Sequence, residues 1–512
     1  MNRTRRILRR IVLFLAAAVG LFATFVIIEH FRGTRALKRH LAALKANGAK
    51  LEVNELLPPK SVPDENALAA LLALTNRVSQ VHSNIGLWPP LGRLTTNGHA
   101  LAISRLNDWS SGKESNSWTR VNAALDGQQE LFTAITAALQ RPGWDDGFEY
   151  SRGFVDFQIP PLTHLKLTAR VLHIATLHAL RSGDREGAIN RLGCLLSLVQ
   201  RQDHSPLIIS QLVRIATAAY AWSATWETLQ SGSLTEKQLL SLQSIWQQND
   251  VPKDMTRALE MERAMTLTHY QLLGASRETL LTVVKQTEQT YDLIYEIEGP
   301  PTRGAWLYHV HLPLWRAAWF EQDQLHSLNR WQSIIDTDQA LCRSSWMAMR
   351  ERFDSQIATE QKSFESSGTP QLKRSTYDGW RFLLSREQFG IGPELLMKAQ
   401  KSQIHAHLAM TAIALERYHL KHGRPPAELT ALVPEFLRAV PLDNADGKPL
   451  RYRLQPNGTF LLYSLGENFQ DDGGDPTPLN PDRLYSDIWN GKDAVWPTPA
   501  TAAEATTAAH RR

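Results

Sequence analysis

The stretch LHALRSGDREGAINRL, residues 177–192, decides the fold class. Apolar residues recur at three- and four-residue spacing on both sides of Ser182-Gly183-Asp184, which is the pattern of two amphipathic helices joined by a tight turn. Gly187 and Ala188 are small enough to let two helices approach each other, so we expect both at a close interhelical contact. The segment therefore predicts an antiparallel helical hairpin.

Helical spacing of apolar residues continues on both sides of this hairpin, over residues 118–287. The hairpin resembles the helix-turn-helix unit of tetratricopeptide arrays, but no period of about 34 residues repeats along the chain. We therefore expect residues 64–390 to form a mainly α domain of irregular helical hairpins. Such hairpins offer concave surfaces to peptide or protein partners.

Toward the N-terminus, the sequence predicts a membrane anchor. Residues 11–28, IVLFLAAAVGLFATFVII, carry no charge, and as a helix they span about 27 Å, close to the hydrocarbon thickness of a bilayer. The one small-x-small site, residues 16–18, lies inside this run, which favours an uncleaved signal anchor. Five Arg in the basic leader, residues 1–10, favour a cytoplasmic N-terminus. We expect residues 29–63 to be a stalk and linker, followed by a domain outside the bacterial inner membrane.

Charge and cysteine content exclude two classes of protein. Residues 1–50 hold eleven Lys and Arg against one acidic residue, and the rest of the chain holds 45 against 50. A weakly acidic body has no general attraction for phosphate backbones, so nucleic acid is not an expected partner. The two cysteines, Cys194 and Cys342, are too few for a disulfide framework or a CxxC site. Whether they pair with each other stays open.

The C-terminal part switches from a helical to a mixed pattern. One long helix is expected over residues 394–422 because its apolar residues form a stripe. Strands are expected at 450–454 and 459–464, with Pro456-Asn457-Gly458 as the turn between them. An acidic loop, GENFQDDGGD at 466–475, follows this hairpin.

The order of these elements resembles that of a known family. The runs that carry the resemblance are ALERY (414–418), HGRPP (422–426), VPLD (440–443), GKPLRY (447–452) and YSLG (463–466). Over about 90 of the 512 residues they resemble the C-terminal half of the major pseudopilin of type II secretion. The resemblance implies a pseudopilin-like α+β module at 391–496. A prepilin peptidase site is missing, since Gly20-Leu21-Phe22 lies inside the apolar run, so we expect no processing or polymerisation as a pilin subunit.

The resemblance also implies a calcium site, because in that family the acidic loop binds calcium through Asp side chains and backbone carbonyls. The corresponding oxygen donors here are Leu465, Asn468, Asp471, Asp472, Asp475 and Asp487. Leu465 would offer its carbonyl, and Asn468 with two or three of the aspartates would offer side chains. Water would complete the six to eight oxygens that Ca²⁺ takes. The alternative is that the loop is a solvated turn.

Catalytic motifs of the common kinds are missing: the sequence has no GxSxG, HExxH, P-loop or GxGxxG pattern. His405 and His407 lie two apart on a predicted helix, so they point about 200° away from each other and cannot chelate one ion. The carboxylate pairs Asp145-Asp146 and Glu260/Glu262 would suit acid–base chemistry. Solvated surfaces explain such pairs equally well.

The whole arrangement resembles a family of single-pass, membrane-anchored bacterial proteins, and the resemblance brings no known activity with it. We expect a non-catalytic interaction or assembly component of an envelope complex, with one membrane span, envelope protein partners and a disordered tail at 497–512. The alternative is a membrane-anchored hydrolase that acts on envelope material. The hydrolase would need a deep polar pocket with converging carboxylates or histidines.

Overall fold

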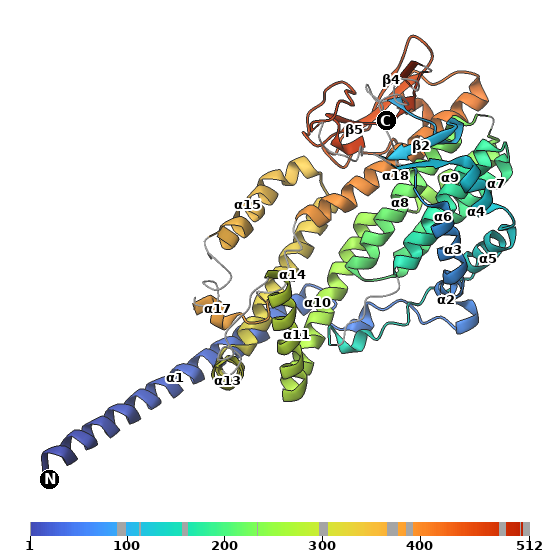
Figure 1. The fold of residues 1–512 in the computed structure, drawn as a ribbon. Helices are drawn as coiled ribbons and strands as arrows, with labels where there is room; N and C mark the ends of the chain where they lie inside the picture. The colour runs from blue at the N-terminus through green and yellow to red at the C-terminus, as the bar shows by residue number, and fades with distance from the viewer. Residues whose placement is uncertain are drawn as a thin grey trace.

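Figure 1 shows the computed structural model, which describes residues 2–89, 99–111, 114–155, 162–232, 234–295, 306–365, 377–385, 393–480, 488–501 and 503–504. It is mostly helical, as expected, with α1 projecting from one end and small sheets lying toward the other. The helices are α1 (Asn2–Ala46), α2 (Ala67–Ala73), α3 (Thr75–Ile85), α4 (Trp118–Leu125), α5 (Gln129–Leu139), α6 (Leu162–Arg181), α7 (Arg185–Arg201), α8 (Ile208–Gln230), α9 (Glu236–Gln247), α10 (Val251–Ala275), α11 (Arg277–Tyr295), α13 (Leu312–Ala318), α14 (Phe320–Cys342), α15 (Trp346–Glu365), α17 (Tyr377–Arg381) and α18 (Pro393–His422). The strands are β1 (His99–Ala100), β2 (Asp108–Ser111), β3 (Glu114–Ser117), β4 (Arg451–Leu454), β5 (Phe460–Leu465), β6 (Asp493–Val495) and β7 (Thr498–Pro499).

Helix α1 runs without a break from the basic leader to Ala46. Residues 11–28 contain neither charge nor proline to interrupt it, and Gly48, with φ +78°, stops it two residues after Ala46. Among the described residues it is the one helix that is long and apolar enough to cross a membrane, and none of its most apolar window is buried in the protein. The expectation of one candidate membrane span is confirmed.

The second half of α1 is an integral helix of the domain and not a free stalk. Leu37 and Leu44 are buried in one cluster with leucines of α10 and α14. Gly33 permits a close approach to α14, because a Cβ atom there would lie 2.8 Å from Cγ of Gln322. The amide Nε2 of Gln322 donates to the Glu29 carboxylate at 2.8 Å and to its backbone carbonyl at 2.9 Å. Part of the expected stalk is therefore packed from Glu29 onward.

The predicted helical hairpin is confirmed in α6 and α7. Gly183, with φ +78°, makes the turn, and the Asp184 side chain caps α7 by accepting from Gly187 N at 2.9 Å. Ala188 is fully buried, as expected of a close contact. Gly187 differs from the expectation: a Cβ atom there would first meet the Asp184 carboxylate of its own helix cap.

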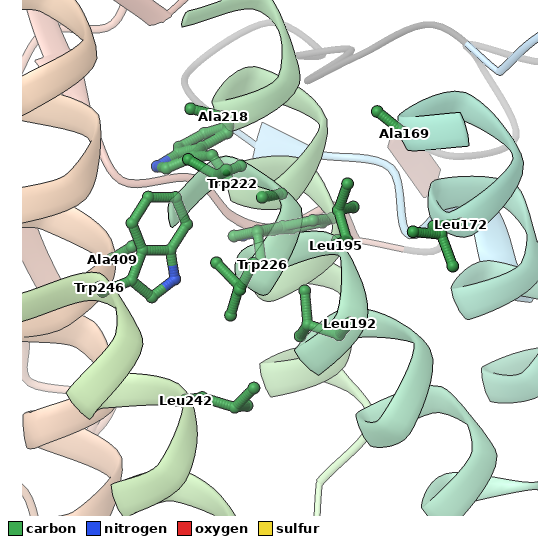
Figure 2. Close-up of a cluster of buried hydrophobic side chains, with 14 of the residues drawn as sticks. Ala169, Leu172, Leu192, Leu195, Ala218, Trp222, Trp226, Leu242, Trp246 and Ala409 are labelled. Carbon is green, nitrogen blue, oxygen red and sulfur yellow. The ribbon is translucent and has the colours of Figure 1, made fainter. Parts of the chain in front are cut away.

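One hydrophobic core joins the helical part to the C-terminal part. Helix α18 packs along α8 and α9, and its Ala409 belongs to the same cluster as Trp222 and Trp246 (Figure 2). The indole Nε1 of Trp226 donates to the Pro497 carbonyl at 2.8 Å. The segments 64–390 and 391–496, which the sequence separates at a linker, therefore depend on each other for burial of their apolar faces.

The expected elements of the C-terminal part are present. Helix α18 is followed by the antiparallel pair β4–β5, and β6 adds a third strand on the other side of β5. The first residues of the expected tail are placed: β7 pairs in parallel with β1, and the Nδ1 atom of His99 lies 2.7 Å from Oε1 of Glu504. Residues 505–512 lie outside the described residues. The likeness to a pseudopilin itself remains a prediction.

Candidate functional site

A hollow of about 900 Å³ lies where the segment after the anchor helix, the helical domain and the C-terminal part meet. Five segments line it: the residues just after α1, the first turns of α10, the end of α14, the middle of α18 and the loop 442–447. Clefts at such junctions are the usual places for binding sites.

Helix α10 supplies one wall. Its start is fixed by Asp250, whose carboxylate accepts from Lys253 N at 3.2 Å as an N-cap. Three- and four-residue spacing then places Lys253, Thr256, Arg257 and Glu260 on one side of the helix, and all four line the hollow. The spacing of these four polar residues thus gives α10, which is otherwise buried, one polar side that forms a wall of the hollow.

The opposite wall is held together by His407 of α18. Burial lowers the pKa of His407, so its imidazole is neutral near pH 7. The hydrogen-bond network then assigns the proton to Nδ1, which donates to the Leu442 carbonyl at 2.9 Å, while Nε2 accepts from Gln403 at 3.0 Å. Gln403 in turn accepts from Val251 N at 3.3 Å, which links α18 to α10. Both ring nitrogens of His407 are engaged in structure.

Behind the α10 wall lies a buried acid. The hydroxyl of Thr256 donates to Oδ2 of Asp338 at 2.5 Å, and Asp338 is fully buried. Burial raises the pKa of Asp338 to about 7. Its Oδ1 atom has no hydrogen-bond partner among the described residues. Cys342 follows one turn later in α14, and burial, with Asp338 nearby, raises the pKa of its thiol to about 12.

The two cysteines, whose pairing the sequence left open, are both free. Cys194 lies 3.1 Å from the Thr136 hydroxyl, and burial raises the pKa of its thiol. Burial thus favours the protonated form of Cys194, which is a weak nucleophile, whereas Cys342 lies at an exposed position.

The hollow carries charges of both signs. The cationic side chains in its lining are Lys50, Lys253, Arg257 and Arg343, and the exposed or half-buried acids are Glu55, Asp250 and Glu260. Burial raises the pKa of Glu260, although Arg263 and Lys50 act in the opposite direction. The guanidinium of Arg257 donates to the Leu56 carbonyl at 3.3 Å, which ties the segment after α1 to this wall. A lining of this kind suits a polar ligand with charges of its own.

A hydrolytic centre needs a nucleophile bonded to a base that a third group orients. In the described lining, the pair of Thr256 and Asp338 comes nearest to that arrangement. Both nitrogens of His407 have hydrogen-bond partners in the protein, so His407 is not bonded to this pair.

The carboxylate pairs noted in the sequence do not form sites. Asp146 accepts from the Tyr150 hydroxyl at 2.6 Å and from Phe148 N at 3.0 Å, so it closes a local loop. Glu260 faces the hollow, whereas Glu262 accepts from Ile208 N at 3.0 Å on another side of α10. His405 stacks on Trp222 of α8, away from His407, as the helical spacing predicts.

The acidic loop holds its side chains in local hydrogen bonds. Asn468 Nδ2 donates to Asp472 at 2.7 Å, and Asp471 accepts from the Tyr463 hydroxyl at 3.0 Å and lies 3.5 Å from Nε of Arg451. Asp471 thus contacts the hairpin, while Asn468 and Asp472 bond to each other.

The remaining predicted ligands that the structure describes also have contacts within the protein. Asp475 pairs with Lys492 Nζ at 2.8 Å and accepts from Thr477, and these hydrogen bonds lower its pKa to about 2. The Leu465 carbonyl accepts from the Ser464 hydroxyl at 3.1 Å. Asp487 lies outside the described residues. No group of three or more His, Cys, Asp or Glu suited to a metal occurs in the described part of the chain.

Sequence reasoning missed Asp493 of β6 at this loop. Asp493 is fully buried, and its Oδ2 atom accepts from Gly474 N at 2.8 Å and from Asp475 N at 3.0 Å. Its Oδ1 atom has no partner among the described residues. The residue lies 18 positions beyond the acidic loop, and only the pairing of β6 with β5 brings it there.

Calcium is expected to raise the melting temperature of the full-length protein if the loop binds it, because a ligand of the folded state stabilises that state by mass action. The whole chain must be used, since α18 shares its core with α8 and α9. Changing Asp472→Ala together with Asp475→Ala should abolish the rise, whereas magnesium should not reproduce it. If millimolar calcium leaves the melting of the wild-type protein unchanged, the loop is a solvated turn.

Comparison of the chain with models of protein families, with curated proteins and with solved structures found no match in any of the three.

Proposed function

We propose that this protein is a single-pass protein of the bacterial inner membrane that serves as a non-catalytic interaction or assembly component of an envelope complex. The basic leader, residues 1–10, favours a cytoplasmic N-terminus and an extracytoplasmic domain. The pseudopilin-like module and its calcium loop are part of this proposal. They are supported by the order of long helix, hairpin and acidic loop in residues 393–475.

The observation that carries the proposal is the composition of the hollow. Its walls are bonded to one another through His407, Gln403 and Arg257. Its mixed charges favour a polar segment of a protein partner over an apolar ligand. Because the anchor segment, the helical domain and the C-terminal part all contribute, a bound segment would bridge all three.

Site-specific photocrosslinking in intact membranes tests this assignment. A photoreactive residue at Gln339, in the hollow, is expected to give a discrete adduct, and one at the exposed Leu240 of α9 is not. The change Lys253→Glu should lower the adduct yield several-fold because it reverses a charge in the lining. The matched change Lys237→Glu on α9 should leave the yield unaltered. An adduct that is insensitive to Lys253→Glu would contradict a partner in the hollow.

The alternative, a membrane-anchored hydrolase acting on envelope material, is favoured by one observation, the hydrogen bond from Thr256 to Asp338 beside the hollow. A hydroxyl bonded to a carboxylate is the first part of an activated nucleophile. Hydrolysis of envelope material by the purified protein that disappears on Thr256→Val would favour the hydrolase. If Lys253→Glu loses the crosslinked adduct and the purified wild-type protein hydrolyses no envelope material, the interaction protein is favoured.

A further inference from the structure

We propose that the underside of the domain rests on the lipid bilayer, through a surface formed by Trp306, Val310, Tyr377 and Trp380. We call these four side chains the basal aromatic surface. The proposed occupant is the headgroup–acyl boundary of the same bilayer that α1 crosses. The inference rests on the membrane span of the proposed function and adds a second, peripheral membrane contact to it.

The first observation is the level at which the domain meets α1. The Phe25 ring packs edge-on against Trp319, with ring centroids 6.2 Å apart, and Val26 packs against the buried cluster around Trp315 and Trp319. Phe25 and Val26 belong to the apolar run 11–28. At 1.5 Å per residue, only about 3 Å of helix lies between Val26 and the end of that run. The domain therefore touches α1 at the membrane boundary, with no stalk between them.

The second observation is the exposure of large aromatic residues at this same level. Trp306 is 42% exposed, Val310 52%, Tyr377 50% and Trp380 36%. Their positions are linked to the anchor through rings, since Trp319 contacts Tyr377 at 5.8 Å, and Trp306 contacts Trp380 at 5.3 Å. In Figure 1, α13 and α17 lie beside α1 at the end of the domain nearest the N-terminus. The surface thus continues outward from the apolar face of the anchor.

The surface is held in place by buried hydrogen bonds. The Nε2 atom of His311, in the π-helical turn Leu307–His311, donates to the Trp380 carbonyl at 2.9 Å. Asp323 of α14 is fully buried and accepts from Leu384 N at 2.8 Å and Ser385 N at 2.9 Å. These bonds fix α17 against α13 and α14. The aromatic side chains are therefore presented by anchored structure.

The chemistry of the surface fits the boundary between headgroups and acyl chains. Tryptophan and tyrosine favour that level because their rings are apolar and their N–H or O–H groups need polar partners. The Arg381 guanidinium of α17 lies 5.4 Å from the Tyr377 ring centroid and pairs with Asp378 at 2.9 Å. A soluble protein partner would have to occupy the bilayer surface itself to cover these residues.

Spin labels on full-length protein in phospholipid vesicles test the proposal. In a background with Cys194→Ser and Cys342→Ser, single changes Phe14→Cys, Val310→Cys and Leu240→Cys place a label in the span, on the basal aromatic surface and on the exposed side of α9. We expect oxygen to reach the labels at 14 and 310, while a water-soluble nickel complex reaches them several-fold less often than the label at 240. The label at 310 should be the shallower of the two lipid-shielded sites.

The three positions separate the outcomes. A label at 14 that is open to nickel would refute the membrane span and with it the proposed function. A shielded label at 14 with an open label at 310 would refute the basal contact alone. If position 310 becomes shielded in native membranes but not in pure lipid, a protein covers the surface, and the lipid proposal is wrong. Should the cysteine-free background unfold, quenching of tryptophan fluorescence by brominated lipid, compared between wild type and Trp306→Phe, decides the same question.

Discussion

Replacing Asp443 by alanine is expected to destabilise the protein by about 3–5 kcal/mol, because it removes one partner of a buried ion pair. Asp443 is fully buried and collects four donors. Its carboxylate accepts from Ala445 N at 2.9 Å, Ser464 Oγ at 2.7 Å and Leu465 N at 3.0 Å, and it pairs with Arg451 at 2.6 Å. Without it, these buried donors lose their acceptor.

Removing the Asp443 carboxylate should also disturb the wall of the hollow. Loop 442–447 is one of its walls, and Asn444 of this loop accepts at its carbonyl from Trp346 N at 3.0 Å, which ties the loop to α15. Arg451 would retain Asp446, so the strand β4 need not detach. We therefore expect Asp443→Ala to lower both the unfolding midpoint and the yield of the adduct from Gln339.

Denaturation followed by tryptophan fluorescence in detergent measures this effect. The matched control is Asp472→Ala, because Asp472 is exposed and its side chain accepts from the Asn468 side chain at 2.7 Å. Asp443→Asn should fall between the two, since an amide keeps one acceptor oxygen and turns an N–H₂ group toward the other donors. Equal midpoints for Asp443→Ala and Asp472→Ala would show that the buried carboxylate contributes nothing net.

Features set by neighbouring residues could be predicted from the sequence. The hairpin α6–α7, the long helix α18 and the pair β4–β5 follow from apolar spacing and from turns at Gly183 and Asn457-Gly458. Such signals lie within a few residues of the structure that they determine. The apolar run of α1 has the same local character.

Features set by distant residues could not be predicted. The pattern of residues 29–46 is amphipathic in a stalk and in a packed helix alike, so its contact with α14 has no signal of its own. Glu260, Cys342 and His407 were each visible in the sequence, but the hollow that gathers them is built from five segments. The strand β7 depends on β1, about 400 positions earlier. Tertiary packing alone decides these features.

A second large effect on stability is expected from Glu227 of α8. Its side chain is buried, and its partner Ile103 lies 124 positions earlier in the sequence. Its carboxylate accepts from Ile103 N at 2.6 Å and from the Ser104 hydroxyl at 3.0 Å. Burial raises the pKa of Glu227 from 4.5 to about 7, although these hydrogen bonds act in the opposite direction. The ionised form of Glu227 therefore lowers the stability of the folded protein at neutral and alkaline pH.

The sign follows from proton binding. Between about pH 4.5 and 7 the folded state holds a proton on Glu227 that the unfolded state has released, so stability falls as the pH rises through this window. Buried histidines act in the other direction: burial lowers the pKa of His173 to about 3 and of His269 to about 4, so stability rises with pH up to about 6.5. The two effects oppose each other below about pH 6.5, and from there to about pH 7 these histidines no longer offset the fall in stability that Glu227 causes.

The change Glu227→Gln isolates the contribution of this carboxylate. Glutamine keeps an oxygen for Ile103 N and can donate to the Ser104 hydroxyl, but it has no charge to bury. The stability of the variant relative to wild type should rise by about 2 kcal/mol from pH 5 to pH 8. Proton linkage predicts a change of this size from the raised pKa of Glu227. The control change Glu351→Gln, on an exposed side of α15, should leave the difference in stability between pH 5 and pH 8 as it is in wild type. Unfolding midpoints of both proteins, measured at pH 5 and pH 8, test this prediction. If the midpoints of Glu227→Gln and wild type change by the same amount between the two pH values, Glu227 is already ionised at pH 5 in the folded protein. The raised pKa would then be wrong.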